Sequence, residues 1–155
     1  MGIELTRAIE SDCIQIHQIQ IHAFSKLLAK YHDYETSPAA EKPEDIYRRF
    51  IQDTTDYYLI RHMNALVGMI RVCNYGNRCR ISPVAILPEY QGMGYGKQAV
   101  IDVEKLYPKA KIWELDTIVQ EENLCSFYEK LGYRKTGRTE KIQEGMDLAF
   151  FEKYV

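Results

Sequence analysis

The sequence predicts a mixed α/β fold, that is, a sheet with both parallel and antiparallel strands and helices packed on it. Helix-like and strand-like segments recur along all 155 residues, and helices separate some of the strands but not others. Strands joined through a helix can run parallel, whereas strands joined by a short turn run antiparallel, so the sheet is expected to be mixed. The length suits a single domain over residues 1–155, and a hydrophobic content of 46% is ample for one core.

The N-terminal part is expected to hold one strand and two helices. Residues 3–9 alternate in polarity, which is typical of a half-buried strand. The apolar residues that follow recur at roughly helical spacing and predict a helix that ends near Tyr31. Residues 32–43 are polar and are expected to form a loop. Pro43 suits the first position of a helix, which predicts a short helix over 43–53.

Three consecutive strands follow, over residues 56–62, 65–75 and 78–87. Asn64 lies at the turn between the first two. Pro83 lies inside the third strand and cannot donate a hydrogen bond to the ladder, so a bulge or a local splay is expected there.

The C-terminal half is expected to hold, in order, a helix over 94–107, a strand over 111–118, a helix over 122–131 and an antiparallel pair over 133–140 and 146–154. Pro108 stops the first of these helices, and Gly132 is expected to cap the C-terminal end of the second.

The glycine-rich segment before the 94–107 helix is the most informative part of the chain. An apolar run ends at Pro88, and Gly92, Gly94 and Gly96 follow just as the helical pattern begins. Glycine has no Cβ, so the main chain can approach a ligand closely. The first N–H groups of a helix have no partner inside it, and the helix dipole favours an anion there. This order of residues therefore predicts a phosphate-binding loop.

Two common phosphate-binding motifs do not fit this loop. The dinucleotide fingerprint needs a glycine at its sixth position, where this chain has Lys97. The Walker A loop needs four residues between its glycines, whereas three residues separate Gly92 from Gly96, and Gln98 rather than Ser or Thr follows the lysine. A nucleotide-dependent kinase is therefore disfavoured.

The spacing Gln91-x-x-Gly94-x-Gly96 resembles the acyl-CoA signature Q/R-x-x-G-x-G/A of the GNAT superfamily of N-acyltransferases. A second segment resembles another motif of that family, in which an Asn, here Asn123, is followed five residues later by a Tyr, here Tyr128, and then by a Leu-Gly-aromatic helix end. The resemblance spans nearly the whole chain, and its specific motifs lie within residues 80–137.

This resemblance implies a GNAT-like fold with a central mixed, mostly antiparallel sheet flanked by helices. In that family two adjacent parallel central strands splay apart, and the gap holds the pantetheine arm of acetyl-CoA. Here those strands would be 78–87 and 111–118, so that the expected bulge at Pro83 lies where the splay could arise.

The resemblance also implies which residues bind acetyl-CoA. Main-chain N–H groups of the loop would bind the pyrophosphate, and a main-chain N–H near Ile86 or Leu87 would polarise the thioester carbonyl. Lys97 either adds charge or points to solvent, and Asn123 either caps its helix or hydrogen-bonds the pantetheine. The expected cofactor-binding residues are Ile86, Leu87, Gln91, Gly92, Met93, Gly94, Tyr95, Gly96, Lys97 and Asn123.

By the same resemblance, Tyr128 is the expected general acid, which protonates the leaving thiolate. A phenol with a pKa near 10 suits a thiolate of similar basicity. The general base is left open, because residues 78–88 contain no carboxylate before the turn at Glu89. Glu114 and Asp116 lie on one face of the next strand, and Glu114 is taken as the catalytic candidate.

The acceptor is expected to be a primary amine of a small molecule or peptide. Its pocket is expected to be built by residues 22–40 and by the loop over 140–146, with His32 and Glu35 as substrate-binding residues. Aromatic and titratable side chains cluster in that first segment, and specificity usually resides in loops on a rigid scaffold.

Bulk composition bears on partners and location. A net charge of −2 without a basic patch argues against nucleic acid, and the absence of an apolar run of 18 residues argues against a membrane span. The N-terminal residues do not resemble a signal peptide, so a cytoplasmic location with reduced cysteines is expected. The spacing of the four Cys and four His matches no metal-binding pattern, so no metal is expected.

A second function stays open at this point: a GNAT-fold module that binds or senses acyl-CoA without turnover. The lack of an obvious base favours it, and Tyr128 argues against it. The acyl chain is also open, as is the oligomeric state, for which a homodimer is one alternative.

Overall fold

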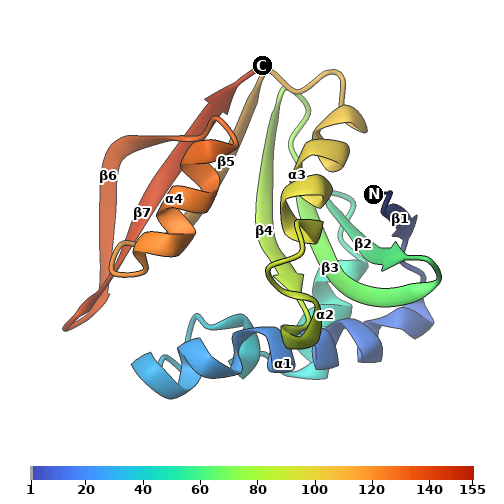
Figure 1. Cartoon of the computed structure of the whole chain (residues 1–155), viewed down its shortest axis with the longest axis horizontal. Helices are drawn as coiled ribbons and strands as arrows, with labels where there is room; N and C mark the ends of the chain where they lie inside the picture. Colours follow the sequence, from blue (N-terminus) through green and yellow to red (C-terminus); the bar gives the residue numbers. More distant parts are fainter. Residues whose placement is uncertain (1) are drawn as a thin grey trace.

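A computed structural model describes residues 2–155 as one seven-stranded sheet with four α-helices on its two faces (Figure 1). The strands are β1 Glu4–Arg7, β2 Thr55–His62, β3 Ala65–Asn74, β4 Arg78–Ile86, β5 Ile112–Ile118, β6 Arg134–Gln143 and β7 Met146–Tyr154. The helices are α1 Cys13–Tyr31, α2 Pro43–Phe50, α3 Tyr95–Lys105 and α4 Glu122–Lys130. The strand order is β1-β2-β3-β4-β5-β7-β6, and β4 and β5 run parallel while the other neighbours run antiparallel.

The predicted mixed fold is confirmed, and so is each predicted strand and helix. The main differences are at element ends. Helix α2 stops at Phe50 rather than at residue 53. Strand β6 continues to Gln143 rather than to residue 140, because its last residues pair with β7 as far as Gln143 and Met146. Local sequence patterns define the ends of elements poorly, since pairing with another segment decides where a strand stops.

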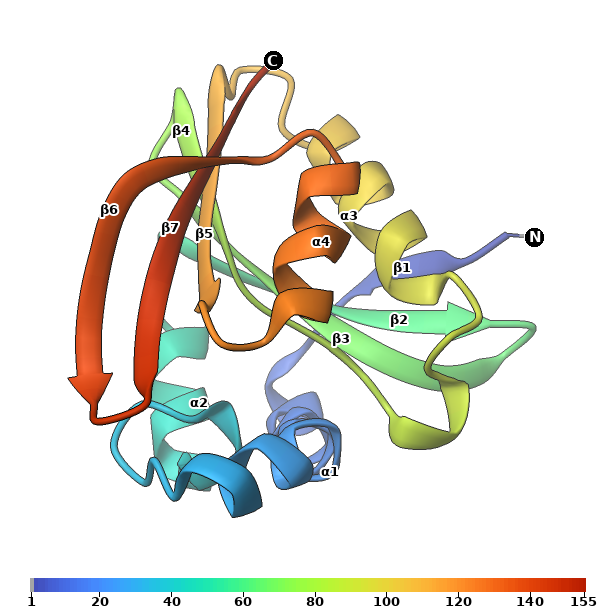
Figure 2. The same ribbon diagram turned by 60° about the vertical axis from the view of Figure 1, so that its left-hand side comes forward.

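Two hydrophobic cores lie on opposite faces of the sheet. Alternate residues of a strand point to opposite faces. Tyr58 and Ile60 of β2 therefore join the core beneath α3 and α4, whereas Tyr57 and Leu59 join the core beneath α1 and α2. Figure 2 shows α3 and α4 next to each other on one face, with α1 and α2 on the other side of the sheet.

The two parallel strands separate along their length. Strands β4 and β5 are paired only between Arg78 and Arg80 of β4 and Ile112 and Glu114 of β5. Beyond that point they diverge, and the sheet opens into a V whose arms are seen in Figure 1.

A bulge in β4 accompanies this divergence, as the position of Pro83 predicts. Ile70 of β3 pairs with Val84, and Val72 pairs with Ile81, so β4 has one residue more than β3 over this stretch. The extra residue bends β4 and increases its twist.

A partly buried carboxylate links the two arms at the closed end of the V. The carboxylate of Glu104, on α3, accepts hydrogen bonds of 2.8 Å from the Tyr133 hydroxyl and from Lys153 Nζ on β7. This contact fixes the helix that follows the glycine loop relative to β7.

Within residues 2–155 no helix has the length and apolarity needed to cross a bilayer.

Candidate active site

A cavity of about 330 Å³ occupies the gap where β4 and β5 diverge. It extends through the sheet, because its walls come from helices on both faces. The lining residues are Phe24, Leu27 and Tyr31 of α1, Asp33 and residues 36–38 of the loop that follows, residues 81–84 of β4, residues 116–118 of β5, Leu124 and Tyr128 of α4, and Met146 and Leu148 of β7. The structure therefore brings Tyr128 and the segment after α1 to the same cavity.

The glycine loop presents main-chain N–H groups at the start of α3. Gly94 is the residue before the helix and has a φ of 87°, and Gly92 has a φ of 79°. Positive φ values of this kind favour glycine. The first hydrogen bond inside the helix runs from Gln98 N to the Gly94 carbonyl, at 3.1 Å. The N–H groups of residues 95–97 therefore point out of the helix end, as an anion site requires.

The side chain of Gln91 forms a hydrogen bond within the loop. Its Nε2 donates a hydrogen bond of 2.8 Å to the carbonyl of Ile86. The contact holds the glycine loop against the end of β4, and it gives a physical reason for the first residue of the signature.

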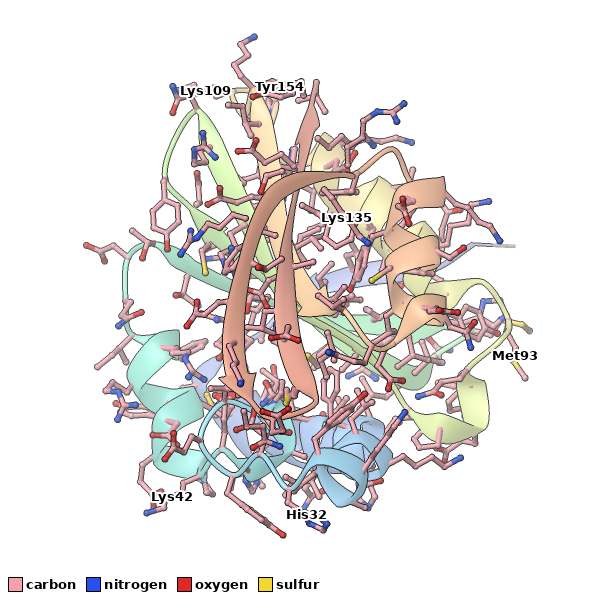
Figure 3. All side chains as sticks on the ribbon, turned by 90° about the vertical axis from the view of Figure 1, so that its left-hand side faces the viewer. His32, Lys42, Met93, Lys109, Lys135 and Tyr154 are labelled. Atoms are coloured by element: carbon pink, nitrogen blue, oxygen red, sulfur yellow. The ribbon has the colours of Figure 1, made fainter. Side chains whose placement is uncertain are left out.

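The side chains of the other loop residues point in different directions. Met93 is half exposed and lies at the outer edge of the loop (Figure 3). Tyr95 is buried and its ring packs on His62, with centroids 5.1 Å apart. For both residues the main chain, and not the side chain, belongs to the candidate anion site.

Lys97 and Asn123 line a second hollow of about 300 Å³ between the start of α3 and α4. Ser126 and Lys130 lie in the same hollow. The cap of α4 is Glu121, so Asn123 does not cap the helix and its exposed side chain faces the hollow. This surface joins the glycine loop to the helix that carries Tyr128.

Of the N–H groups of Ile86 and Leu87 at the end of β4, only one is free of a hydrogen bond within the sheet. Leu87 N donates to the Val67 carbonyl at 2.8 Å, so this N–H is used inside the sheet. Successive N–H groups of a strand point to opposite edges. The N–H of Ile86 therefore faces the β5 side, where the strands have separated. Of the two residues expected to polarise the thioester carbonyl, only Ile86 keeps a free N–H, since the N–H of Leu87 is used in the sheet.

Tyr128 lies in the cavity wall with its ring held by other aromatic rings. Its centroid is 5.0 Å from that of Phe127, 6.2 Å from that of Tyr133 and 6.5 Å from that of Phe151. Burial raises the pKa of Tyr128 above its usual value of 10, and within the described residues no neighbouring charge or hydrogen bond contributes. The hydroxyl is therefore protonated throughout the neutral range.

The structure does not place Glu114 at the cavity. Glu114 lies opposite Arg80, at the last position where β4 and β5 are paired, and it accepts a hydrogen bond of 2.6 Å from Arg78. The gap opens only beyond this position. Asp116, two residues further along β5, does line the cavity and forms an ion pair with Arg80. We therefore do not retain Glu114 as the base.

His32 and Glu35 are likewise outside the cavity. His32 ends α1 with a φ of 53°, and its exposed side chain points to solvent (Figure 3). Glu35 is exposed as well. The left-handed turn at His32 directs the neighbouring residues Tyr31 and Asp33 to the cavity instead. Asp33 is the residue that the sequence analysis missed, although an Asp followed by Thr36 is a recognisable turn signal.

Tyr31 also links α1 to the start of α4. Its hydroxyl donates a hydrogen bond of 2.5 Å to Glu121 Oε2, and Lys30 Nζ lies 2.7 Å from the same oxygen. The hydrogen bonds from Lys30 and Tyr31 lower the pKa of Glu121 below its usual value of 4.5. This contact joins the two helices that flank the cavity on opposite faces of the sheet.

The lowered pKa of Glu121 predicts a pH-dependent contribution to stability. The contribution is complete above the unfolded pKa and is lost as the pH falls through the lower, folded pKa. We expect Glu121→Gln to destabilise the protein modestly at neutral pH and to differ less from the wild type in acid. Urea denaturation between about pH 3 and pH 7 measures this difference. Glu122→Gln, at the exposed neighbour, is the control, and a destabilisation that does not change with pH would contradict the prediction.

No group of three or more His, Cys, Asp and Glu side chains within residues 2–155 is arranged to hold a metal ion.

Comparisons with known proteins agree with this geometry. A model of the acetyltransferase (GNAT) family matches residues 15–133. The PaiA N-acetyltransferase of Thermoplasma acidophilum, solved in complex with coenzyme A, is similar with a TM-score of 0.80 and 19% identity over 100% of both chains. No curated protein sequence matches the chain significantly.

Two further solved structures have the same fold. The ribosomal-protein-S18-alanine N-acetyltransferase of Escherichia coli has a TM-score of 0.80 and 11% identity, over 99% of this chain and 94% of that one. A GNAT family acetyltransferase from Elizabethkingia anophelis with acetyl-CoA bound has a TM-score of 0.73 and 18% identity, over 99% of this chain and 98% of that one. At such identities the likeness shows the fold alone.

Proposed function

Because the chain belongs to the acetyltransferase (GNAT) family, we propose that it transfers the acetyl group of acetyl-CoA to a primary amine of a small molecule or peptide. One observation carries the proposal: Tyr128 lines the cavity between β4 and β5, and the chain continues from the end of β4 through the glycine loop to a helix start with free N–H groups. These are the donors that acyl transfer from a thioester needs.

The glycine loop fits a pyrophosphate. Gly92 has open space within 4 Å of the position that a Cβ would take, and the N–H groups of residues 95–97 point out of the helix end. Lys97, in the adjacent hollow, adds a positive charge next to this anion site. Acetyl-CoA supplies the activated acetyl thioester, and in this proposal the N–H groups of the loop bind its phosphates.

We assign the chemistry inside the gap to two groups. The N–H of Ile86 faces the separated edge of β4 and can donate to the oxygen that becomes negative as the amine attacks. Tyr128 holds a proton at its hydroxyl, and this proton passes to the sulfur as the carbon–sulfur bond breaks. The attacking nitrogen loses one proton in turn, which restores the hydroxyl of Tyr128. The acceptor amine has to arrive neutral, and it enters from the α1 side, where the cavity is lined by Tyr31, Asp33 and residues 36–38.

Calorimetric titration with coenzyme A and ATP, followed by a turnover assay, tests the proposal. We expect coenzyme A to bind and ATP not to bind, because the loop lacks the Walker pattern. We expect acetyl-CoA to release its thiol only when an amine is present. Binding of acetyl-CoA without turnover across a broad amine panel would instead identify a non-catalytic acyl-CoA-binding module, and no binding of coenzyme A would contradict both functions.

A further inference from the structure

Asp33 is a buried carboxylate in the cavity wall, and no cationic side chain among residues 2–155 forms an ion pair with it. Its exposed fraction is 4%, and it lines the cavity. Its Oδ1 accepts hydrogen bonds from the main-chain N–H groups of Glu35, at 3.2 Å, and Thr36, at 3.0 Å, and its Oδ2 accepts one from the Thr36 hydroxyl. These donors supply hydrogen bonds but no positive charge. A carboxylate has about four lone-pair positions, so a further donor can bind.

The charge of Asp33 distinguishes it from the other carboxylate of the cavity. Asp116 forms an ion pair with Arg80. Asp33 forms none with any residue of the described chain, 2–155. Buried charges in proteins are usually paired, because an unpaired one is costly. A cationic group of a bound molecule would supply the missing charge at this position.

We assign that cationic group to a part of the acceptor other than the reacting nitrogen, because both oxygens of Asp33 are already held by hydrogen bonds from residues 35 and 36, which suits binding rather than proton transfer. A carboxylate next to an amine favours the protonated form, and a protonated amine has no lone pair with which to attack a thioester. In this assignment the reacting nitrogen lies elsewhere in the cavity, towards Tyr128, and Asp33 binds a second cationic group of the same molecule. Apolar side chains, among them Phe24, Leu27 and Leu124, line the same cavity and suit an alkyl chain.

We propose that the acceptor is an alkyl diamine or polyamine, with one primary amine that is acetylated and a second ammonium group bound by Asp33. The proposal rests on the proposed acetyltransferase function and specifies its substrate class. Asp33 is a specificity-determining residue, and it takes no part in the transfer of the acetyl group or the proton.

The proposal is tested by measuring kcat/KM of the wild-type protein for three acceptors of equal chain length: cadaverine, pentylamine and aminopentanol. Their far ends are an ammonium, a methyl and a hydroxyl group. We expect kcat/KM for cadaverine to exceed that of either monoamine about tenfold or more, after correction for its two equivalent amines. This comparison needs no variant. Equal values for the three compounds, or a preference for pentylamine, would overturn the proposal while leaving the acetyltransferase function intact.

The variant Asp33→Asn tests the same residue directly. Asparagine keeps the size and one oxygen for the Thr36 N–H, and it removes the charge. We expect KM for cadaverine to rise about tenfold and KM for pentylamine to stay unchanged. Asp53→Asn, at an exposed position outside the cavity, is the control. An equal rise of KM for both amines would show a structural role only and overturn the assignment of Asp33.

Binding of acetyl-CoA, measured for each variant, separates this proposal from the one on which it rests. If acetyl-CoA binds but no amine is acetylated, the proposed function fails, and the assignment of an acceptor fails with it. If monoamines and peptides are acetylated and cadaverine is not preferred, only the assignment of Asp33 fails.

Discussion

Replacement of Tyr128 by phenylalanine is expected to lower kcat about 10²- to 10⁴-fold, the usual contribution of a general acid. The change removes only the hydroxyl, and the ring contacts with Phe127, Tyr133 and Phe151 stay. Stability should therefore change little, and the affinity for acetyl-CoA should stay near that of the wild type. Steady-state kinetics with a saturating amine, together with calorimetric titration, measure the two effects separately.

Tyr154→Phe is the matched control, because Tyr154 is exposed at the end of β7 (Figure 3) and does not line the cavity. Near-normal turnover of Tyr128→Phe would mean that another group, or water, protonates the thiolate. The pH profile gives a second test. Since burial raises the pKa of Tyr128 above 10, its loss of a proton should not reduce the rate on the alkaline side below about pH 10.

Replacement of Gly94 by valine is expected to weaken the binding of acetyl-CoA about 10- to 100-fold. Gly94 has a φ of 87° directly before α3. A β-branched residue at such an angle costs about 1–3 kcal/mol, so the loop leaves the conformation that presents its N–H groups to the phosphates. Calorimetric titration with acetyl-CoA measures the loss.

Gly76→Val provides the matched control for this loss. Gly76 lies in the turn between β3 and β4, has a φ of 91°, and has open space around the position of a Cβ. The same backbone penalty is thus introduced outside the loop, and affinity should be kept. An unchanged affinity in Gly94→Val, with the protein still folded, would exclude the loop as the phosphate site.

The position of Gly96 tolerates a Cβ better than that of Gly94. It lies inside the first turn of α3, and a Cβ there would meet Ile86 at 3.5 Å and Phe127 at 3.6 Å, which are ordinary contacts. Alanine is therefore compatible with this position, in agreement with the G/A at the end of the acyl-CoA signature. The requirement for glycine therefore applies to Gly92 and Gly94, which have positive φ values.

The order of the elements and the two motifs could be predicted from the sequence because each depends on residues that are close in the chain. Apolar periodicity predicts the strands and helices, and the glycine positions predict a loop before α3. The bulge at Pro83 was predictable for the same reason, since proline cannot donate to the ladder wherever the strand lies. The spacing of Asn123 and Tyr128 likewise placed both residues on one helix, which ends at Lys130, two residues before Gly132.

The tertiary structure decided which neighbouring residue faces the cavity. Strand alternation puts Glu114 and Asp116 on the same face. The strands β4 and β5 separate between these two positions, so Asp116 lines the cavity, whereas Glu114 stays paired with Arg78. Similarly, the left-handed turn at His32 directs Asp33, rather than His32 or Glu35, to the cavity. Periodicity reports which residues share a face, whereas the point at which two strands separate depends on packing between segments far apart in the chain.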